Sequence, residues 1–142
     1  NGLSVDVEDW FQVGAFEKVI ERGEWDGIKT RVEDNVYRVI DLFAEADVRA
    51  TFFTLGWVAR RHPDMIRRIA DAGHELASHG YDHARVFTFT RAEFAADIRM
   101  AREIIEDCAG VAVTGYRAPS FSIDRRTPWA FAELAEQGYA YS

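Results

Sequence analysis

Short apolar runs and amphipathic stretches alternate along the chain. The run "LSVDVE" at residues 3–8 alternates apolar and polar positions, which predicts a strand that ends in acidic residues. Residues 34–46 carry apolar side chains at helical spacing and predict a helix with one apolar face. The run "RATFFTLG" at residues 49–56 is apolar, β-branched and closed by glycine, which is typical of a buried strand. The first third of the chain therefore indicates strand, helix and strand in succession.

The same order continues in the middle of the chain. Residues 58–73 have apolar positions at helical spacing and end at a glycine, and Pro63 falls near the first or second turn. The run "HELASH" at residues 74–79 predicts a third strand. Residues 90–110 open with a Thr-x-x-Glu capping signature and end at glycine, which predicts a long helix.

The last part of the chain repeats the pattern once more. The run "VAVTGYRAP" at residues 111–119 predicts a fourth strand, and residues 127–138 predict a helix that opens with Thr-Pro and ends at glycine. Alternation of this kind predicts an α/β fold with a parallel sheet, either open or closed into a barrel. The chain starts without methionine and stops at "GYAYS", a run typical of the opening of a strand, so we expect that both ends are cut.

Composition limits the class of protein. The chain has 142 residues, of which 48% are apolar, and residues 1–142 are expected to form one domain or part of one. A net charge of −7 argues against nucleic-acid partners. Cys108 is the single cysteine, so no disulfide forms within the chain. The absence of a long apolar stretch or signal pattern predicts no membrane insertion and favours the cytoplasm; the oligomeric state is not indicated.

Reactive side chains gather at the ends of three predicted strands. In parallel α/β proteins, ligands bind beyond the carboxyl ends of the strands, and chemistry is expected there. Acidic residues end the first strand, two histidines follow the third, and an arginine lies at the end of the fourth. These residues are Asp6, Glu8, Asp9, His79, His83 and Arg117. Their common position carries more weight than any one motif.

The stretch "SHGYDH" at residues 78–83 is a candidate metal site. A His-x-x-x-His pair places both imidazoles on one side of a helical turn, and a carboxylate from another strand would complete three protein ligands. A divalent metal such as zinc would keep an open position for water. The alternative is a pair of solvated loop histidines, and the neighbouring acidic cluster favours the metal site. We expect His62 and His74 to be structural or solvated.

The acidic cluster leaves two carboxylates as candidates for the third ligand. Like charges at a strand end repel one another, and a bound cation would remove that cost. On a strand, Asp6 and Glu8 share a face, so one could bind the metal while the other stays free as a base. If the strand ends at Val7, Asp9 becomes the better ligand. The other interpretation is an acidic loop after an edge strand.

Four segments together resemble a known family. "SVDVEDWF", "ATFFTLGW", "GHELASHGYDH" and "GYRAPSFSID" are similar to the successive motifs of polysaccharide deacetylases, which form carbohydrate esterase family 4 and share the NodB homology domain. The closest resemblance is to the variant often encoded with exosortase and exopolysaccharide genes. The similarity covers nearly the whole chain, with the motifs in the family's order.

The resemblance implies a distorted (β/α) barrel and a metal-dependent hydrolase. Such an enzyme removes N-acetyl groups from an N-acetylhexosamine-containing polysaccharide or oligosaccharide, and its metal is zinc, with cobalt or nickel as alternatives. By this likeness, His79 and His83 bind the metal together with Glu8 or Asp9. The family usually has two adjacent aspartates in its first motif, whereas this chain has Asp6-Val7-Glu8-Asp9, so the choice of acid stays open. Residues 1–142 would then form the family's domain without its C-terminal part.

The resemblance also assigns roles to other residues. Asp6 would act as the base, and Arg117 of the Arg-x-Pro motif would pair with it and orient it. The residue after Pro119 is commonly aromatic in the family, and its backbone N–H helps to bind the oxyanion; here it is Ser120. The family's general-acid histidine would lie beyond residue 142. Three aromatic residues near these motifs could stack on sugar rings, although aromatic side chains more often fill cores: Trp10, Phe11 and Phe121.

Two other functions fit the same residues. The first is a metal-dependent amidase that acts on a small non-sugar amide. The second is a non-catalytic carbohydrate-binding relative of the same fold. Intact metal ligands and a paired base argue against the second, because a binding module does not need them.

Overall fold

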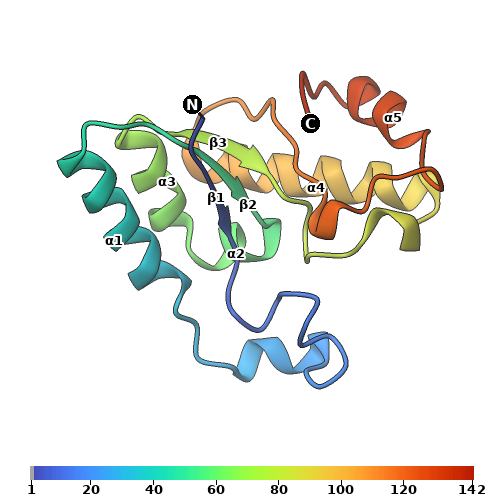
Figure 1. Cartoon of the computed structure of the whole chain (residues 1–142), viewed down its shortest axis with the longest axis horizontal. Helices are drawn as coiled ribbons and strands as arrows, with labels where there is room; N and C mark the ends of the chain where they lie inside the picture. Colours follow the sequence, from blue (N-terminus) through green and yellow to red (C-terminus); the bar gives the residue numbers. More distant parts are fainter. Residues whose placement is uncertain (1) are drawn as a thin grey trace.

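The computed structural model describes residues 2–142, and its centre is a sheet of three parallel strands (Figure 1). The strands are β1 (Ser4–Val7), β2 (Thr51–Thr54) and β3 (Glu75–Ser78), in the spatial order β1-β2-β3. Asp6 is the register partner of Phe53, and Phe53 that of Ala77. Because the strands are parallel, their carboxyl ends lie at the same edge of the sheet.

Helices connect the strands and complete the core. The elements are α1 (Val32–Glu45), α2 (Gly56–Arg61), α3 (Pro63–Asp71), α4 (Arg91–Ala109) and α5 (Ala130–Glu136), with the 3-10 helices η1 (Arg22–Gly27), η2 (Val86–Thr88) and η3 (Pro119–Phe121). Helix α4 contacts α2, α3, α5 and β3 (Figure 1). Phe52, Ile66 and Ile98 are fully buried in the core between strands and helices. None of the helices within residues 2–142 is long and apolar enough to cross a membrane.

The predicted alternation of strands and helices is confirmed, with one helix divided into two. The expected helix at residues 58–73 is α2 followed by α3, and the break falls at His62, whose φ and ψ are −127° and 55°. Pro63 occupies the first turn of α3, and the residue before a proline is disfavoured in the helical region. The Thr90–Glu93 capping box is confirmed at the start of α4.

The predicted fourth strand at residues 111–119 is wrong as a regular strand. The segment runs parallel to β3 but makes only isolated bridges, Ser78 with Tyr116 and Gly115 with Tyr141. Gly115 has no side chain to pack and Pro119 has no N–H to donate, so little of the segment can join a ladder. Two backbone hydrogen bonds still fix it beside β3, because the N–H of Ser78 donates to the Gly115 carbonyl and the N–H of Arg117 donates to the Ser78 carbonyl, each at 2.9 Å.

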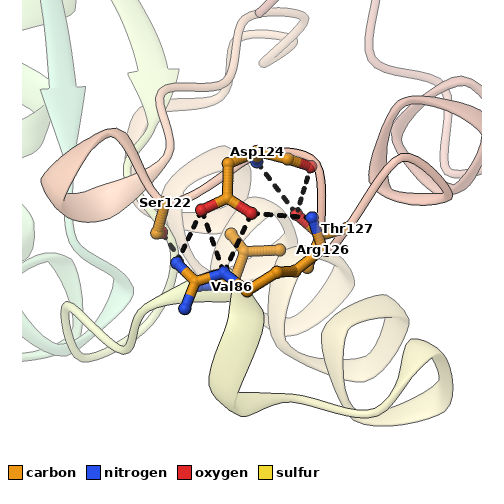
Figure 2. Close-up of polar contacts among 5 residues, drawn as sticks. All are labelled: Val86, Ser122, Asp124, Arg126 and Thr127. Atoms are coloured by element: carbon orange, nitrogen blue, oxygen red, sulfur yellow. Dashed lines mark hydrogen bonds and ion pairs between the residues drawn. The ribbon is translucent and has the colours of Figure 1, made fainter.

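The loop between η3 and α5 is fixed by local polar contacts (Figure 2). The backbone N–H of Val86 donates to the hydroxyl of Ser122 at 2.9 Å, which ties this loop to the start of η2. Asp124 accepts hydrogen bonds from the backbone N–H and the guanidinium of Arg126, and the N–H of Asp124 donates to the Thr127 hydroxyl at 3.1 Å. The loop that contains Ser122 is therefore held against η2.

Asp9 fastens the segment that follows β1 to the start of α1. Its side chain is 2% exposed, and its carboxylate accepts backbone hydrogen bonds from Trp10 at 3.0 Å, Arg31 at 2.7 Å and Val32 at 3.1 Å. The last two donors belong to the N-terminus of α1, where an anion is also favoured by the helix dipole. Asp9 thus closes the segment between residues 9 and 31 into a loop.

We predict that Asp9→Ala lowers the free energy of unfolding by about 2 kcal/mol, because it leaves buried backbone donors without an acceptor. Urea denaturation of both proteins measures the difference. The matched control is Asp41→Ala, which removes an exposed carboxylate from the middle of α1 and is expected to change stability by less than about 0.5 kcal/mol. Equal stability of the two variants would contradict the anchoring role of Asp9.

Candidate metal centre

Three side chains from two segments of the chain meet beyond the carboxyl ends of the strands. Glu8 follows β1 directly, His79 follows β3 directly, and His83 lies four residues further along the same loop. One ligand atom from each of these three residues lies within 4.8 Å of the other two. Parallel pairing explains the convergence, because β1 and β3 flank β2 and their carboxyl ends lie at the same edge of the sheet.

His79 is held in one orientation by a main-chain carbonyl. Its side chain is buried, and Nδ1 lies 2.8 Å from the carbonyl oxygen of Arg117. A carbonyl oxygen only accepts hydrogen bonds, so Nδ1 carries the proton and Nε2 keeps its lone pair. The same arrangement orients metal-ligating histidines in many proteins. The His79 backbone is fixed as well, because its N–H donates to the Thr54 carbonyl at 2.9 Å.

The two histidines lie on an irregular loop, and the expected helical turn is absent. Gly80 and His83 have φ values of 79° and 62°, which are outside the right-handed helical region. The loop instead caps α2, because the N–H groups of Gly56 and Trp57 donate to the carbonyls of Gly80 and Tyr81 at 2.9 Å each. The imidazoles still come together, with ring centroids 5.3 Å apart.

Asp97 on α4 supports this loop and was not predicted from the sequence. Its Oδ2 accepts a hydrogen bond from the backbone N–H of Tyr81 at 3.3 Å, midway between the two histidines. Burial raises the pKa of Asp97 to about 7. A single aspartate within an amphipathic helix carries no sequence signal for such a role, and only the packing of α4 against α2 and β3 reveals it.

One carboxylate oxygen of Glu8 is buried without a hydrogen-bond donor among the described residues. Its Oε2 is buried and makes no hydrogen bond with residues 2–142, although Nε2 of His83 lies 3.1 Å away. Burial and the nearby charge of Asp6 raise the pKa of Glu8 to about 7. An unsatisfied buried carboxylate oxygen is costly unless a cation or a donor reaches it.

Burial favours the neutral form of both histidines in this cluster. Burial and the charge of His79 lower the pKa of His83 to about 4, and burial lowers the pKa of His79. Both imidazoles are therefore neutral near pH 7 and offer lone pairs. Two neutral imidazoles with one unsatisfied carboxylate form a donor set that fits a divalent metal such as zinc.

Asp6 and Arg117 form an ion pair beside this cluster. Nη1 of Arg117 lies 2.5 Å from Oδ1 of Asp6, and Nη2 donates to the hydroxyl of Ser4 at 2.9 Å. The guanidinium also lies over the ring of Phe53, 3.9 Å from its centroid. Three contacts in different directions fix the guanidinium and, through it, one oxygen of Asp6.

The structure separates the two carboxylates that the sequence left as alternatives. Glu8 lies with the histidines, whereas both carboxylate oxygens of Asp9 accept backbone hydrogen bonds at the start of α1. Asp9 therefore does not fit the expected role of third ligand. Ser120 is exposed in η3, directly after the Arg-x-Pro motif, and its φ of 53° gives it a left-handed backbone.

The aromatic residues near the motifs differ in exposure. Phe121 is 93% exposed and Trp10 is 42% exposed, so both rings are open to solvent. Phe11 is 1% exposed and packs against Trp25 and Trp57. Of the three aromatic residues that could stack on sugar rings, Phe11 is thus a core residue.

The chain is similar to a characterised family. The sequence profile described as "Polysaccharide deacetylase" matches residues 25–141, a range that contains His79, His83, Arg117 and Ser120 and begins after Asp6 and Glu8. A peptidoglycan-N-acetylglucosamine deacetylase of Bacillus cereus is 32% identical over 94 residues, which is 66% of this chain and 34% of that protein. A chitin deacetylase of Colletotrichum lindemuthianum is 36% identical over 92 residues, which is 61% of this chain and 37% of that protein.

Solved structures agree with the sequence comparisons. The crystal structure of a putative polysaccharide deacetylase from Mycobacterium smegmatis superposes with a TM-score of 0.77 and 31% identity, over 97% of this chain and 48% of that one. The chain spans about a third of the length of the two curated relatives described above. The profile match and this superposition together show that the chain belongs to the polysaccharide deacetylase family.

Proposed function

We propose that this chain carries the metal site and the base of a hydrolase that removes N-acetyl groups from an N-acetylhexosamine-containing polysaccharide. The observation that supports it most strongly is the convergence of Glu8, His79 and His83 beside the Asp6–Arg117 ion pair. The relatives named above for peptidoglycan and chitin deacetylation support the substrate class. The motif resemblance further favours a polymer of the exopolysaccharide type.

Glu8, His79 and His83 would hold the metal in this proposal. Nitrogen and oxygen donors of this kind suit zinc best, and cobalt or nickel would also fit. When bound, a divalent cation would acidify a water molecule and polarise the acetyl carbonyl. The protein contributes the neutral His79 tautomer, which the carbonyl of Arg117 fixes.

Asp6 is the base in this proposal. Its carboxylate would take a proton from the attacking water, and the contact with Arg117 would hold the carboxylate in one orientation. The backbone N–H of Ser120 would donate to the acetyl oxygen, which becomes an oxyanion when water attacks the carbonyl carbon. The left-handed backbone at Ser120 and Phe121, with φ values of 53° and 54°, is consistent with a loop shaped to present a backbone group.

We predict that His79→Ala and His83→Ala lose the bound metal, because each removes one of three protein ligands. Elemental analysis of protein purified without chelator should find about one divalent ion per wild-type chain and little in either variant. His62→Ala is the matched control, since His62 pairs with Glu33 away from this cluster.

The same elemental analysis tests the choice between the two acids. Glu8→Gln should weaken metal binding, whereas Asp9→Asn should not. Wild-type protein without metal would contradict both enzymatic interpretations and favour a carbohydrate-binding relative.

We predict that Asp6→Asn keeps the metal but reduces the rate of acetate release from N-acetylglucosamine oligomers by about 100-fold or more, because the amide cannot take a proton. Ser4→Ala is the control, since it removes the other side chain that accepts a hydrogen bond from the Arg117 guanidinium and leaves the Asp6 carboxylate in place. Loss of metal in Asp6→Asn would show that Asp6 is a ligand. Acetate release from small non-sugar amides alone would favour the general amidase.

A further inference from the structure

The peptide group between Gly80 and Tyr81 is bound at both ends, and it lies between the two histidines of the candidate metal centre. Its carbonyl, which belongs to Gly80, accepts the N–H of Gly56 at the start of α2 at 2.9 Å. Its N–H, which belongs to Tyr81, donates to Oδ2 of Asp97 on α4 at 3.3 Å. Because a peptide group is planar, these two contacts on opposite sides fix both its position and its orientation.

Asp97 lies on the buried face of α4. Phe94 and Ala101 are both 0% exposed, and residues at this spacing from Asp97 share one side of a helix. The carboxylate also lies close to the backbone of Gly80, because a Cβ atom added there would be 3.1 Å from Oδ2 of Asp97. Asp97 therefore contacts the histidine loop at two successive residues.

The packing between α2, the histidine loop and α4 leaves little room for movement. A Cβ atom added to Gly56 would lie 2.9 Å from the ring of Tyr81 and 3.0 Å from Cα of Ala101. Both distances are shorter than a Cβ atom normally tolerates, so the start of α2 lies directly against the backbone of α4. Asp97 is one helical turn before Ala101. The position of α4 is thus transmitted to the loop through the Asp97 carboxylate.

An acid at this position is unfavourable for the fold alone. Burial and the charge of Asp82 raise the pKa of Asp97 to about 7. A leucine would have a similar size without the cost of a buried carboxylate. Asp82 lies in the same loop, and its own carboxylate pairs with Arg22 at 3.1 Å. What Asp97 provides here is an acceptor for the Tyr81 N–H.

We propose that Asp97 is a positioning residue of the candidate metal centre. Its carboxylate holds the Tyr81 N–H, and the held peptide sets the position of His83 relative to His79. The inference rests on the proposed function, in which both histidines bind the metal. Metal–ligand distances must be correct to within about 0.2 Å, so a small displacement of the loop is enough to weaken binding. Asp97 acts through the backbone of the loop and does not touch the metal.

Titration of the metal-free full chain with cobalt ions tests this role, because the visible spectrum of bound cobalt reports its coordination geometry. Asp97→Ala removes the acceptor, and Asp97→Leu does so without leaving a cavity. Each is expected to weaken cobalt binding about tenfold and to change the spectrum. Asp97→Asn keeps an acceptor oxygen without the charge and should bind cobalt like the wild type. The matched control is Glu103→Ala, which removes an exposed acid from the same helix and should also match the wild type.

Urea denaturation of the metal-free proteins separates positioning from a merely structural role. If Asp97 only stabilises the fold, Asp97→Ala lowers the urea midpoint but binds cobalt with the wild-type affinity and spectrum, and this result overturns the proposal. Equal weakening in Asp97→Asn and Asp97→Ala overturns it as well, because the charge and not the acceptor would then matter. The leucine variant gives the same test if the alanine variant does not fold.

The outcomes also separate this inference from the proposed function. A wild-type chain that binds no cobalt refutes the metal centre and the inference together. Cobalt binding by the wild type, with the same affinity and spectrum in Asp97→Ala and Asp97→Leu, refutes only the role of Asp97. Acetate release from N-acetylglucosamine oligomers, measured in parallel, tests the deacetylase activity alone. Cobalt binding that depends on Asp97 without acetate release therefore supports the positioning role and refutes the activity.

Discussion

Parallel pairing of β1, β2 and β3 places their carboxyl ends at one edge of the sheet, and the candidate site is built from residues just beyond those ends. Glu8 and His79 are the first residues after their strands. The strand register therefore fixes the distance between the backbones of Glu8 and His79. A register shift of one residue in β1 would turn Glu8 to the opposite face and remove it from the histidines.

Arg117 contacts both His79 and Asp6. Its carbonyl accepts the N–H of His79, which sets the imidazole tautomer, and its guanidinium binds Asp6, which sets the carboxylate orientation. The backbone of Arg117 is fixed in turn by its N–H, which donates to Ser78 at the end of β3. His79, the proposed metal ligand, and Asp6, the proposed base, are therefore both held by Arg117, and a backbone displacement at Arg117 would disturb both.

The sequence predicted the order of elements and the residues that converge, because both follow from periodicity and from the position of strand ends. It could not predict that residues 111–119 form only isolated bridges, since this depends on Gly115 and Pro119 in a particular tertiary setting. It also placed the histidine pair on a helical turn, whereas Gly80 and His83 adopt positive φ. The support from Asp97 depends on helix packing and has no local signature.

Glu8 and Asp9 are adjacent in the sequence, but their side chains have different partners. Side chains at neighbouring positions point to opposite faces, so Asp6 and Glu8 can share the site only if Val7 and Asp9 face the other way. Val7 and Asp9 are both buried, at 1% and 2% exposure. Asp9 closes the loop between β1 and α1, while Glu8 faces the histidines. The two consecutive acids thus have separate positions: Glu8 lies in the candidate metal centre, and Asp9 holds the start of α1.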